Sequence, residues 1–578
     1  MLRNVIFFIF VLSSSSGLLF SQQAPADLVV INGKVLTVDE QSSQAEAAAV
    51  RDGLFVAVGT NEEIRGLIGE ETRVLDAEGR VVVPGLIETH VHATGAARRD
   101  LTAPFTQLGS IKEIQDWVRE QAQAKPAGSW ILIPRVDVTR IREGRIPTGA
   151  ELDEAAPHHP VVFNWQYANH QIQILNSQAL RVAQIKADTP VSERGQIEVD
   201  ENGKPTGVIR NAGELTAKFL RSREPTESEY LENLSRLLRS YNELGITSIF
   251  ERSTNADGYR DFEKLKEWDL LPVRVTVTIR VQSDGSVEDT EKFIKSLPFK
   301  YGDGDDWLRV GPLKIGVDGG ILYGTAYMRE PYGKGSFTLY RISDPEYRGG
   351  LRGIEPEHVE NMIRTGHRLG WQMSSHVTGD AGVDLVLDAV EKAHQDSPIT
   401  SRRYTLIHAY FPNPEAAQRA AKLGVVVDTQ PAWYYKDGDA LAAALGSHRL
   451  RNFIGVAEWR RAGVKVALNS DHMQGFDPDK SLNPYNPFLA MYAAVTRKTE
   501  GGQVFGPAQR ISREEALRML TIDAAYLGFD EEKRGSIEVG KLADFAILSK
   551  DLMTCDPEEI KDIRAVATVV GGRVVHQR

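Results

Sequence analysis

Short apolar runs alternate with amphipathic stretches through most of the chain. The runs are rich in Val, Ile and Leu, and the segments between them repeat their apolar residues with helical spacing. Parallel strands covered by helices on both faces have this near-continuous apolar character. The pattern therefore predicts an α/β fold with a (β/α)8 TIM-like barrel over residues 85–527. The eight predicted strands lie at 85–92, 246–250, 272–280, 310–317, 371–376, 404–409, 425–427 and 464–469.

Both ends of the chain read as shorter strands that are separated by turn residues. Residues 27–84 and 528–578 are predicted to be the two parts of a β-sandwich, and the pattern permits their pairing without requiring it. The dipeptides Asn32-Gly33, Asp52-Gly53 and Gly571-Gly572 each predict a hairpin, because these residues favour the positive φ angles of two-residue turns.

One long segment interrupts the alternation after the first strand of the predicted barrel. Residues at about 100–220 are too many for an ordinary βα loop, so they predict an inserted subdomain over the barrel mouth. A substrate lid and a purely structural elaboration are both open at this point.

The N-terminus resembles an export signal. Residues 1–22 combine Arg3 with a short apolar core that four serines interrupt, which is typical of a signal peptide rather than a membrane span. We therefore expect a periplasmic or secreted protein, with an uncleaved anchor as the alternative. No later segment is apolar enough to span a bilayer. Cys555 is the only cysteine, so an intrachain disulfide and a site built from several thiolates are both excluded.

Net charge changes the choice of partner. The 578 residues carry a formal charge of −11, which argues against a nucleic-acid partner. A small-molecule substrate is expected instead, and a homodimer is left open.

Residues that commonly bind metals end several of the predicted strands. His90 and His92 end the first strand, where positions i and i+2 point to the same face. His376, His408 and Asp471 end the fifth, sixth and eighth strands. Active sites of such barrels lie at the carboxyl ends of the strands. Imidazoles and a carboxylate that converge there predict a divalent metal site.

The fourth strand carries a lysine, Lys314, within an apolar run. Burying a lone ammonium group is costly. Reaction with carbon dioxide would convert it to an anionic carbamate that can bridge two metals. The alternative is an outward-facing lysine whose amine reaches solvent.

At these residues the chain resembles the metal-dependent amidohydrolase superfamily, and most closely its YtcJ-like (amidohydrolase-3) branch. The likeness covers nearly the whole chain after the signal segment. Its opening motif has Glu88 where the branch usually has aspartate. The motifs that carry the resemblance are Pro84-Gly85-Leu86-Ile87-Glu88-Thr89-His90-Val91-His92, Lys314 to Gly319, His376 to Asp380, Asn176 to Leu180, and Gly535 to Phe545.

This resemblance implies roles for individual residues. His90 and His92 would bind the more buried metal, carbamylated Lys314 would bridge, and His376 and His408 would hold a second ion in a binuclear site. Asp471 would contact metal and act as the catalytic base. One or two divalent ions per chain are implied, with zinc as the expected metal. The implied reaction is hydrolysis of a C–N bond in an amide, N-acyl compound or cyclic amide.

Three residues are secondary candidates for substrate contacts: His170 in the insertion, Asp318 after the fourth strand, and His472 beside Asp471. Three other functions stay open. They are a metal-dependent deaminase of a nitrogen heterocycle, an esterase or lactonase on the same scaffold, and a non-catalytic binding protein. The lysine counts against the deaminase, because deaminase relatives usually use one metal and lack it.

Overall fold

The computed structural model describes residues 24–578 apart from 168–169 and 221–222. The predicted signal segment, 1–22, lies outside the described residues. Within the described chain, no helix is long and apolar enough to cross a membrane.

The central feature is an eight-stranded sheet in which every neighbouring pair of strands is parallel. All eight predicted strands are present, so the barrel prediction is confirmed. The sheet closes between its first and last strands, where Val91 bridges His472 and the His92 amide donates to the His472 carbonyl at 2.8 Å. The strands are β8 (Leu86–Val91), β14 (Ile246–Thr254), β15 (Arg274–Arg280), β16 (Leu308–Gly316), β17 (Met373–Val377), β18 (Thr405–His408), β19 (Val426–Thr429) and β20 (Val466–Leu468).

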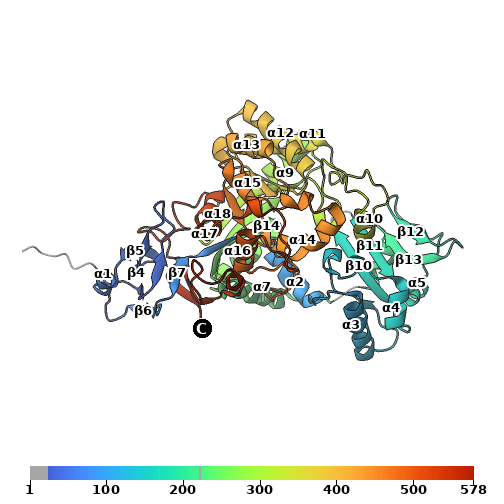
Figure 1. The fold of residues 1–578 in the computed structure, drawn as a ribbon, viewed down its shortest axis with the longest axis horizontal. Coiled ribbons are helices and arrows are strands. Elements are labelled where there is room, and N and C mark those ends of the chain that lie inside the picture. Colours follow the sequence, from blue (N-terminus) through green and yellow to red (C-terminus); the bar gives the residue numbers. More distant parts are fainter. Residues whose placement is uncertain (1–23, 168–169, 221–222) are drawn as a thin grey trace, which may run out of the picture.

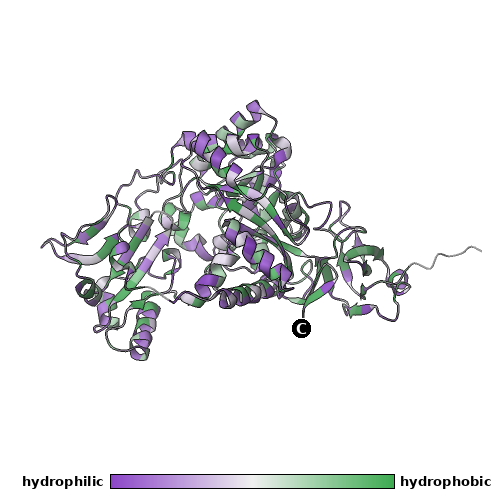
Figure 2. Ribbon diagram, turned by 180° about the vertical axis from the view of Figure 1, so that it is seen from behind, coloured by the Kyte–Doolittle hydropathy of each residue, from purple (hydrophilic) through white to green (hydrophobic). Residues whose placement is uncertain are grey.

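Helices surround this sheet, as Figure 1 shows. Several begin at a residue whose side chain accepts a bond from the first turn, such as Thr226 and Asn413. Figure 2 shows hydrophobic residues along the strands in the middle of the molecule and hydrophilic ones over much of the outer helices. The main helices are α2 (Ala93–Thr102), α7 (Glu227–Asn242), α8 (Ala256–Glu267), α9 (Val287–Ser296), α11 (Pro356–Arg368), α12 (Asp380–Asp396), α13 (Pro414–Lys422), α14 (Pro431–Leu445), α15 (Val456–Arg461), α16 (Pro487–Thr496), α17 (Arg513–Met519) and α18 (Ile522–Leu527).

Strands from both chain ends share one sheet. In the six-stranded sheet, β7 (Val81–Pro84) pairs with β21 (Phe545–Leu548), and the order is β23-β22-β21-β7-β2-β3. A four-stranded sheet, β5-β4-β1-β6, packs against it through a common apolar core that includes Val30, Phe55 and Phe545. The remaining strands are β1 (Leu28–Ile31), β2 (Lys34–Leu36), β3 (Gln44–Ala45), β4 (Ala47–Arg51), β5 (Leu54–Gly59), β6 (Arg73–Asp76), β22 (Ala565–Val570) and β23 (Arg573–Gln577).

Two of the three predicted hairpins form. Asp52-Gly53 and Gly571-Gly572 connect paired antiparallel strands, and all four residues have positive φ. The hairpin predicted at Asn32-Gly33 is wrong, because β1 and β2 belong to different sheets. Asn32 has the positive φ of a turn, but the chain there crosses between the sheets. Val30 and Val35 can thus enter the same core from opposite sides.

The segment between α2 and α7 folds as a five-stranded sheet with helices, beside the barrel and opposite the sheets of the chain ends (Figure 1). Its order is β12-β13-β11-β10-β9, which matches the predicted insertion after the first barrel strand. Its role as a substrate lid stays a prediction. The elements are α3 (Ile111–Ala124), β9 (Ile131–Leu132), α4 (Gly149–Ala155), β10 (Val161–Tyr167), β11 (His170–Leu175), α5 (Ser177–Ala183), β12 (Gln196–Val199) and β13 (Pro205–Arg210).

Candidate metal centre and active site

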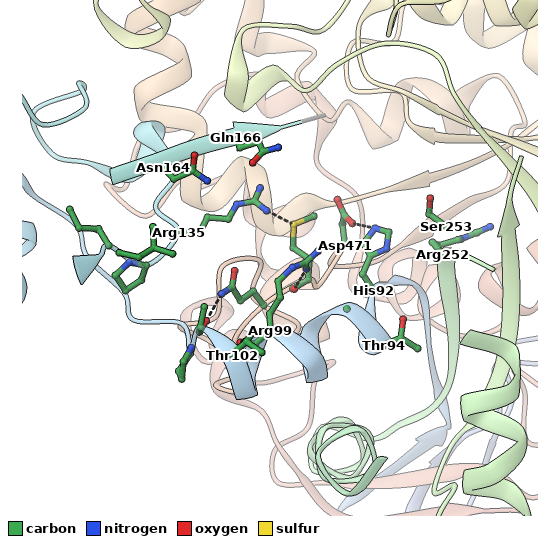
Figure 3. Close-up of a pocket in the computed structure, with 18 of the residues that line it drawn as sticks. His92, Thr94, Arg99, Thr102, Arg135, Asn164, Gln166, Arg252, Ser253 and Asp471 are labelled. Carbon is green, nitrogen blue, oxygen red and sulfur yellow. Dashed lines mark hydrogen bonds and ion pairs between the residues drawn. The ribbon is translucent and has the colours of Figure 1, made fainter. Parts of the chain in front are cut away.

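Three of the predicted ligands meet at the seam of the barrel. His90 lies in β8, His92 immediately precedes α2, and Asp471 follows β20. The Asp471 Oδ1 atom lies 3.3 Å from His90 Nε2 and 3.2 Å from His92 Nε2. One ligand atom from each residue lies within 4.8 Å of the other two. Figure 3 shows the His92 and Asp471 side chains pointing toward one another.

Lys314 joins this group from β16. Its Nζ atom lies 3.2 Å from His90 Nε2, and its side chain is buried. The outward-facing alternative is therefore wrong. Burial lowers the Lys314 pKa to about 7, because the charged ammonium loses its hydration. A substantial share of this amine is therefore neutral near physiological pH.

The remaining two predicted ligands form a second pair beside the first group. His376 Nδ1 and His408 Nε2 lie 2.8 Å apart, and the His408 ring centroid is 5.5 Å from that of His90. Burial lowers the pKa of both imidazoles, that of His408 to about 4, so both are neutral at pH 7. Neutral imidazole is the form that binds metals.

Backbone geometry at the strand ends is unusual. His408 and Asp471 have φ angles of 81° and 52°, in the left-handed region that non-glycine residues seldom adopt. Such strained positions persist where the surrounding structure fixes them, and they concentrate at functional sites. Here the turns direct both side chains toward the same group.

The residues present fit a divalent cation. Asp471 Oδ1 is buried without a hydrogen-bond partner, although it lies between two imidazole nitrogens. An unsatisfied buried carboxylate oxygen is costly, and a cation would satisfy it. Burial pushes the Asp471 pKa upward, but His92, His408 and Lys314 offset this and hold it below its ordinary value. A carboxylate with neutral imidazoles is a suitable donor set for zinc and similar ions.

The structure does not support the predicted substrate contacts at Asp318 and His472. Asp318 is buried and accepts hydrogen bonds from the amides of Tyr327, Thr378 and Gly379 at 2.8–3.0 Å. Both ring nitrogens of His472 have protein partners, the Tyr241 hydroxyl at 2.8 Å and the Gly475 carbonyl at 2.7 Å. Each side chain therefore stabilises a loop. Neither residue is among the described residues that line the cavity. His170 begins β11, and its side chain lies outside the described part of the chain.

Glu88, the departure from the usual motif, connects two parts of the site. Its Oε1 atom accepts bonds from the His90 and Ser470 amides, both at 3.1 Å. Burial raises its pKa to about 8, so the group is largely neutral at pH 7. Glu88 thereby holds the end of β8 against the residue that precedes Asp471.

An ion pair beneath His90 was not predicted from the sequence. Arg252 Nη2 donates to Asp428 Oδ2 at 3.0 Å, and both side chains are fully buried. Arg252 Nε also donates to the Thr89 carbonyl at 2.9 Å, while the Thr89 hydroxyl donates to Asp428 at 2.5 Å. The pair thus holds the backbone next to His90. The signal was available, because Asp428 follows the apolar run 425–427 just as His408 ends the run before it.

A cavity of about 1180 Å³ opens above these groups. The barrel supplies its floor, which includes all six predicted ligands. The insertion supplies much of the wall, and Figure 3 shows Arg135, Asn164 and Gln166 extending from it opposite His92. The site therefore has room for an organic substrate next to the candidate metal ligands.

Comparison with known proteins identifies the family of the chain. The model of the amidohydrolase family matches residues 73–576. The chain belongs to the amidohydrolase family. Its sequence places it in the YtcJ-like branch of the metal-dependent amidohydrolase superfamily, as predicted, and YtcJ of Bacillus subtilis strain 168 is 26% identical over 94% of this chain and 98% of its own length.

Two further curated relatives and one solved structure are similar to this chain over nearly the full length of both proteins. An N-substituted formamide deformylase from Arthrobacter pascens is 29% identical over 96% of this chain and 98% of its own length. The protein LONG AFTER FAR-RED 3 of Arabidopsis thaliana is 28% identical over 95% and 92%. An uncharacterized metal-dependent hydrolase from Pyrococcus horikoshii OT3 has a TM-score of 0.66 at 20% identity, covering 92% of this chain and 99% of that one, and so shares its fold.

Proposed function

We propose that this amidohydrolase-family chain is a metal-dependent hydrolase that cleaves the C–N bond of N-acyl compounds, with N-substituted formamides as the first class to test. The observation that carries the proposal is the convergence of His90, His92 and Asp471 at the floor of a large cavity. The deformylase relative, similar over almost the full length of both chains, supports the choice of substrate class.

His90, His92 and Asp471 would hold one divalent cation, with zinc as the expected metal. His376 and His408 offer two neutral nitrogens for a second. A bound cation polarises a carbonyl group and lowers the pKa of water. These are the two requirements for hydrolysing an amide near neutral pH.

Asp471 is the proposed catalytic base. Its carboxylate is ionised at neutral pH, so it can accept a proton from the attacking water. The water oxygen bonds to the carbonyl carbon, the C–N bond breaks, and the proton passes to the leaving amine. The products are a carboxylic acid and an amine, and Asp471 ends in the state in which it began.

Lys314 would complete a two-metal site. Its depressed pKa provides the neutral amine that reacts with carbon dioxide. The nitrogen bonds to the carbon of carbon dioxide and loses one proton, which leaves a carbamate with two ligand oxygens. A neutral lysine in a one-metal site would instead favour the deaminase alternative.

The direct test is a substrate panel on purified protein loaded with zinc. N-alkyl and N-aralkyl formamides, the matching acetamides, nitrogen heterocycles and simple esters are assayed for amine, ammonia or alcohol release. We expect the formamides to be turned over and Asp471→Asn to reduce kcat by about 10²–10⁴-fold, since it removes the base. Asp257→Asn changes an exposed carboxylate on α8 that is paired with Arg260, and it is the matched control.

Several results would contradict the proposal. Ammonia release from heterocycles without formamide hydrolysis would favour the deaminase, and ester hydrolysis alone would favour the esterase or lactonase. Full turnover by Asp471→Asn would reject its role as base. Metal analysis of Lys314→Ala tests the second ion, because a single metal per chain in both proteins would exclude the binuclear site.

A further inference from the structure

The wall of the cavity has a charge opposite to that of the whole molecule. The chain carries a formal charge of −11, yet arginine and lysine outnumber acidic residues around the cavity. Among the described lining residues the only carboxylates are Glu251 and Asp471. Seven basic residues line the cavity, but Arg252 is paired with Asp428 and Lys314 belongs to the candidate metal centre. The other five are Arg99, Lys125, Arg135, Arg280 and Arg352.

The carboxylates do not cancel this excess. Asp471 belongs to the candidate metal centre. Glu251 is committed to the start of α2, where it accepts bonds from the Ala93 amide at 2.6 Å and the Thr94 hydroxyl at 2.5 Å. Burial also raises its pKa to about 7, which reduces its charge at neutral pH. An anionic group entering the cavity therefore meets a net positive wall, which attracts it.

Arg280 is the cation best placed to bind such a group. It ends β15, and in the parallel ladder it is the register partner of Lys314 in β16. Register partners on adjacent strands point to the same side of a sheet, so Arg280 and Lys314 share a face. No described residue forms a hydrogen bond or an ion pair with the Arg280 side chain, which is exposed to the cavity. An arginine fork without a protein partner is suited to a carboxylate.

Three other arginines that line the cavity add to its positive charge. Arg352 also lines the cavity, where its Nη2 atom lies 3.0 Å from His376 Nε2. A Cβ atom at Gly316 would lie 3.2 Å from Arg352 Nη1, so this glycine leaves the space in which the guanidinium lies. Arg99 and Arg135 add charge nearer the insertion, and Figure 3 shows both beside the cavity.

From this arrangement, and resting on the proposed C–N hydrolysis, we infer that the substrate is an N-acyl compound that carries a carboxylate close to the scissile nitrogen, and that Arg280 binds this carboxylate. In an N-acyl amino acid the carboxylate carbon is two bonds from the amide nitrogen. Its cation must therefore lie beside the candidate metal ligands rather than at the outer rim. The pairing of Arg280 with Lys314 meets that requirement.

Aromatic residues from the insertion also line the cavity, and they suggest which amino-acid side chain a test substrate should carry. Trp130 and Phe219 stack with ring centroids 4.7 Å apart, and Trp117 is a further lining residue. An aromatic amino acid can place its ring against such a surface. N-formylphenylalanine is therefore the probe, and its carboxamide is the matched neutral compound.

The experiment measures kcat/KM for both compounds, as both enantiomers, with zinc-loaded wild type, Arg280→Ala and Arg260→Ala. Arg260 is an exposed arginine on α8 that is paired with Asp257, so its removal changes the net charge equally. We expect wild type to favour the acid by about 10-fold or more. Arg280→Ala should bring the ratio of acid to carboxamide close to one, and Arg260→Ala should keep the wild-type ratio. Raising the salt concentration should reduce the preference, because it screens the attraction.

The thermal unfolding midpoint in the presence of each compound is a second readout that needs no turnover. Equal effects of acid and carboxamide on wild type, or an unchanged ratio in Arg280→Ala, would overturn the inference. Turnover of neutral formamides without a preference for the acid would reject the inference and leave the proposed function standing. Stabilisation by the acid alone, with no hydrolysis of any C–N substrate, would support the anion site and reject the proposed function.

Discussion

Replacing Asp428 with Asn tests whether the buried ion pair of Arg252 and Asp428 supports β8, the strand that carries the candidate metal ligand His90. The substitution removes the charge that faces Arg252 and places an amide N–H group against the guanidinium. The bonds from Thr89 and Asn469 reach the other oxygen, Oδ1, which an asparagine can retain. The loss is therefore concentrated in one charge-assisted bond and in one buried guanidinium left without its counter-charge.

These contributions set the expected size of the effect. Breaking a fully buried pair by removing one partner costs about 3–5 kcal/mol. Because both Oδ1 contacts survive, we expect the lower end, about 3 kcal/mol off the free energy of unfolding. Activity and metal content should fall as well, because Thr89 is held by both members of the pair and precedes His90.

Urea unfolding followed by tryptophan fluorescence and by far-UV circular dichroism measures the change, provided that both probes report the same transition. Arg252→Met and the double variant complete a double-mutant cycle. The double variant should lose clearly less free energy of unfolding than the sum of the two single-variant losses. The exposed substitution Asp257→Asn is the control and should leave the midpoint unchanged. A loss below about 1 kcal/mol in Asp428→Asn, or simple additivity in the double variant, would refute the reasoning.

Three further predictions concern the same region. Glu88→Gln should keep most activity and metal content, because its side-chain oxygen can still accept hydrogen bonds from both amides. Glu88→Ala leaves two buried N–H groups without partners, which lowers the free energy of unfolding by about 1–3 kcal/mol for each, and thermal melts and metal analysis compare the two variants. Burial raises the Glu251 pKa from 4.5 to about 7, so between these pH values the folded protein binds a proton that the unfolded chain has lost, and the free energy of unfolding should fall as pH rises. Melting temperatures measured across this pH range test the prediction, and a Glu251→Gln variant with the same pH dependence as wild type would reject it. Chelation should abolish activity and lower the melting temperature, and added zinc should restore both; full activity after metal analysis shows a metal-free protein would exclude the metal centre.

The barrel was predictable because its strands are buried on both faces and most are rich in apolar residues. An apolar run is visible in one sequence, and so is the polar residue that ends it, as at His408 and Asp428. Loop conformation has no comparable signature. Asp318 and His472 have suitable residue types near the site, but the backbone turns each toward a protein partner.

Contacts between segments that are distant in the sequence were the second feature that could not be predicted. At Asn32-Gly33 the turn residues were read correctly, but which sheet the next strand joins depends on a core shared with strands of the distant C-terminus. Arg252 lies beyond the apolar run 246–250, and its partner Asp428 is 176 residues away. No local sequence pattern identifies the two partners of such a pair. A charged residue at the end of an apolar run is nevertheless a candidate for a buried ion pair near the site.

The sheet shared by the two chain ends also determines the order in which the site can be completed during synthesis. Only Gly85 separates β7 from the metal strand β8, and its amide bonds to the Asp544 carbonyl at 2.8 Å. The ribosome makes His90 and His92 early, but β21, one of the two strands that pair with β7, emerges among the last residues. A nascent chain therefore holds two ligands long before it can fix their positions. A chain that ends between Asp471 and β21 lacks this support, even though all six predicted ligands are already present.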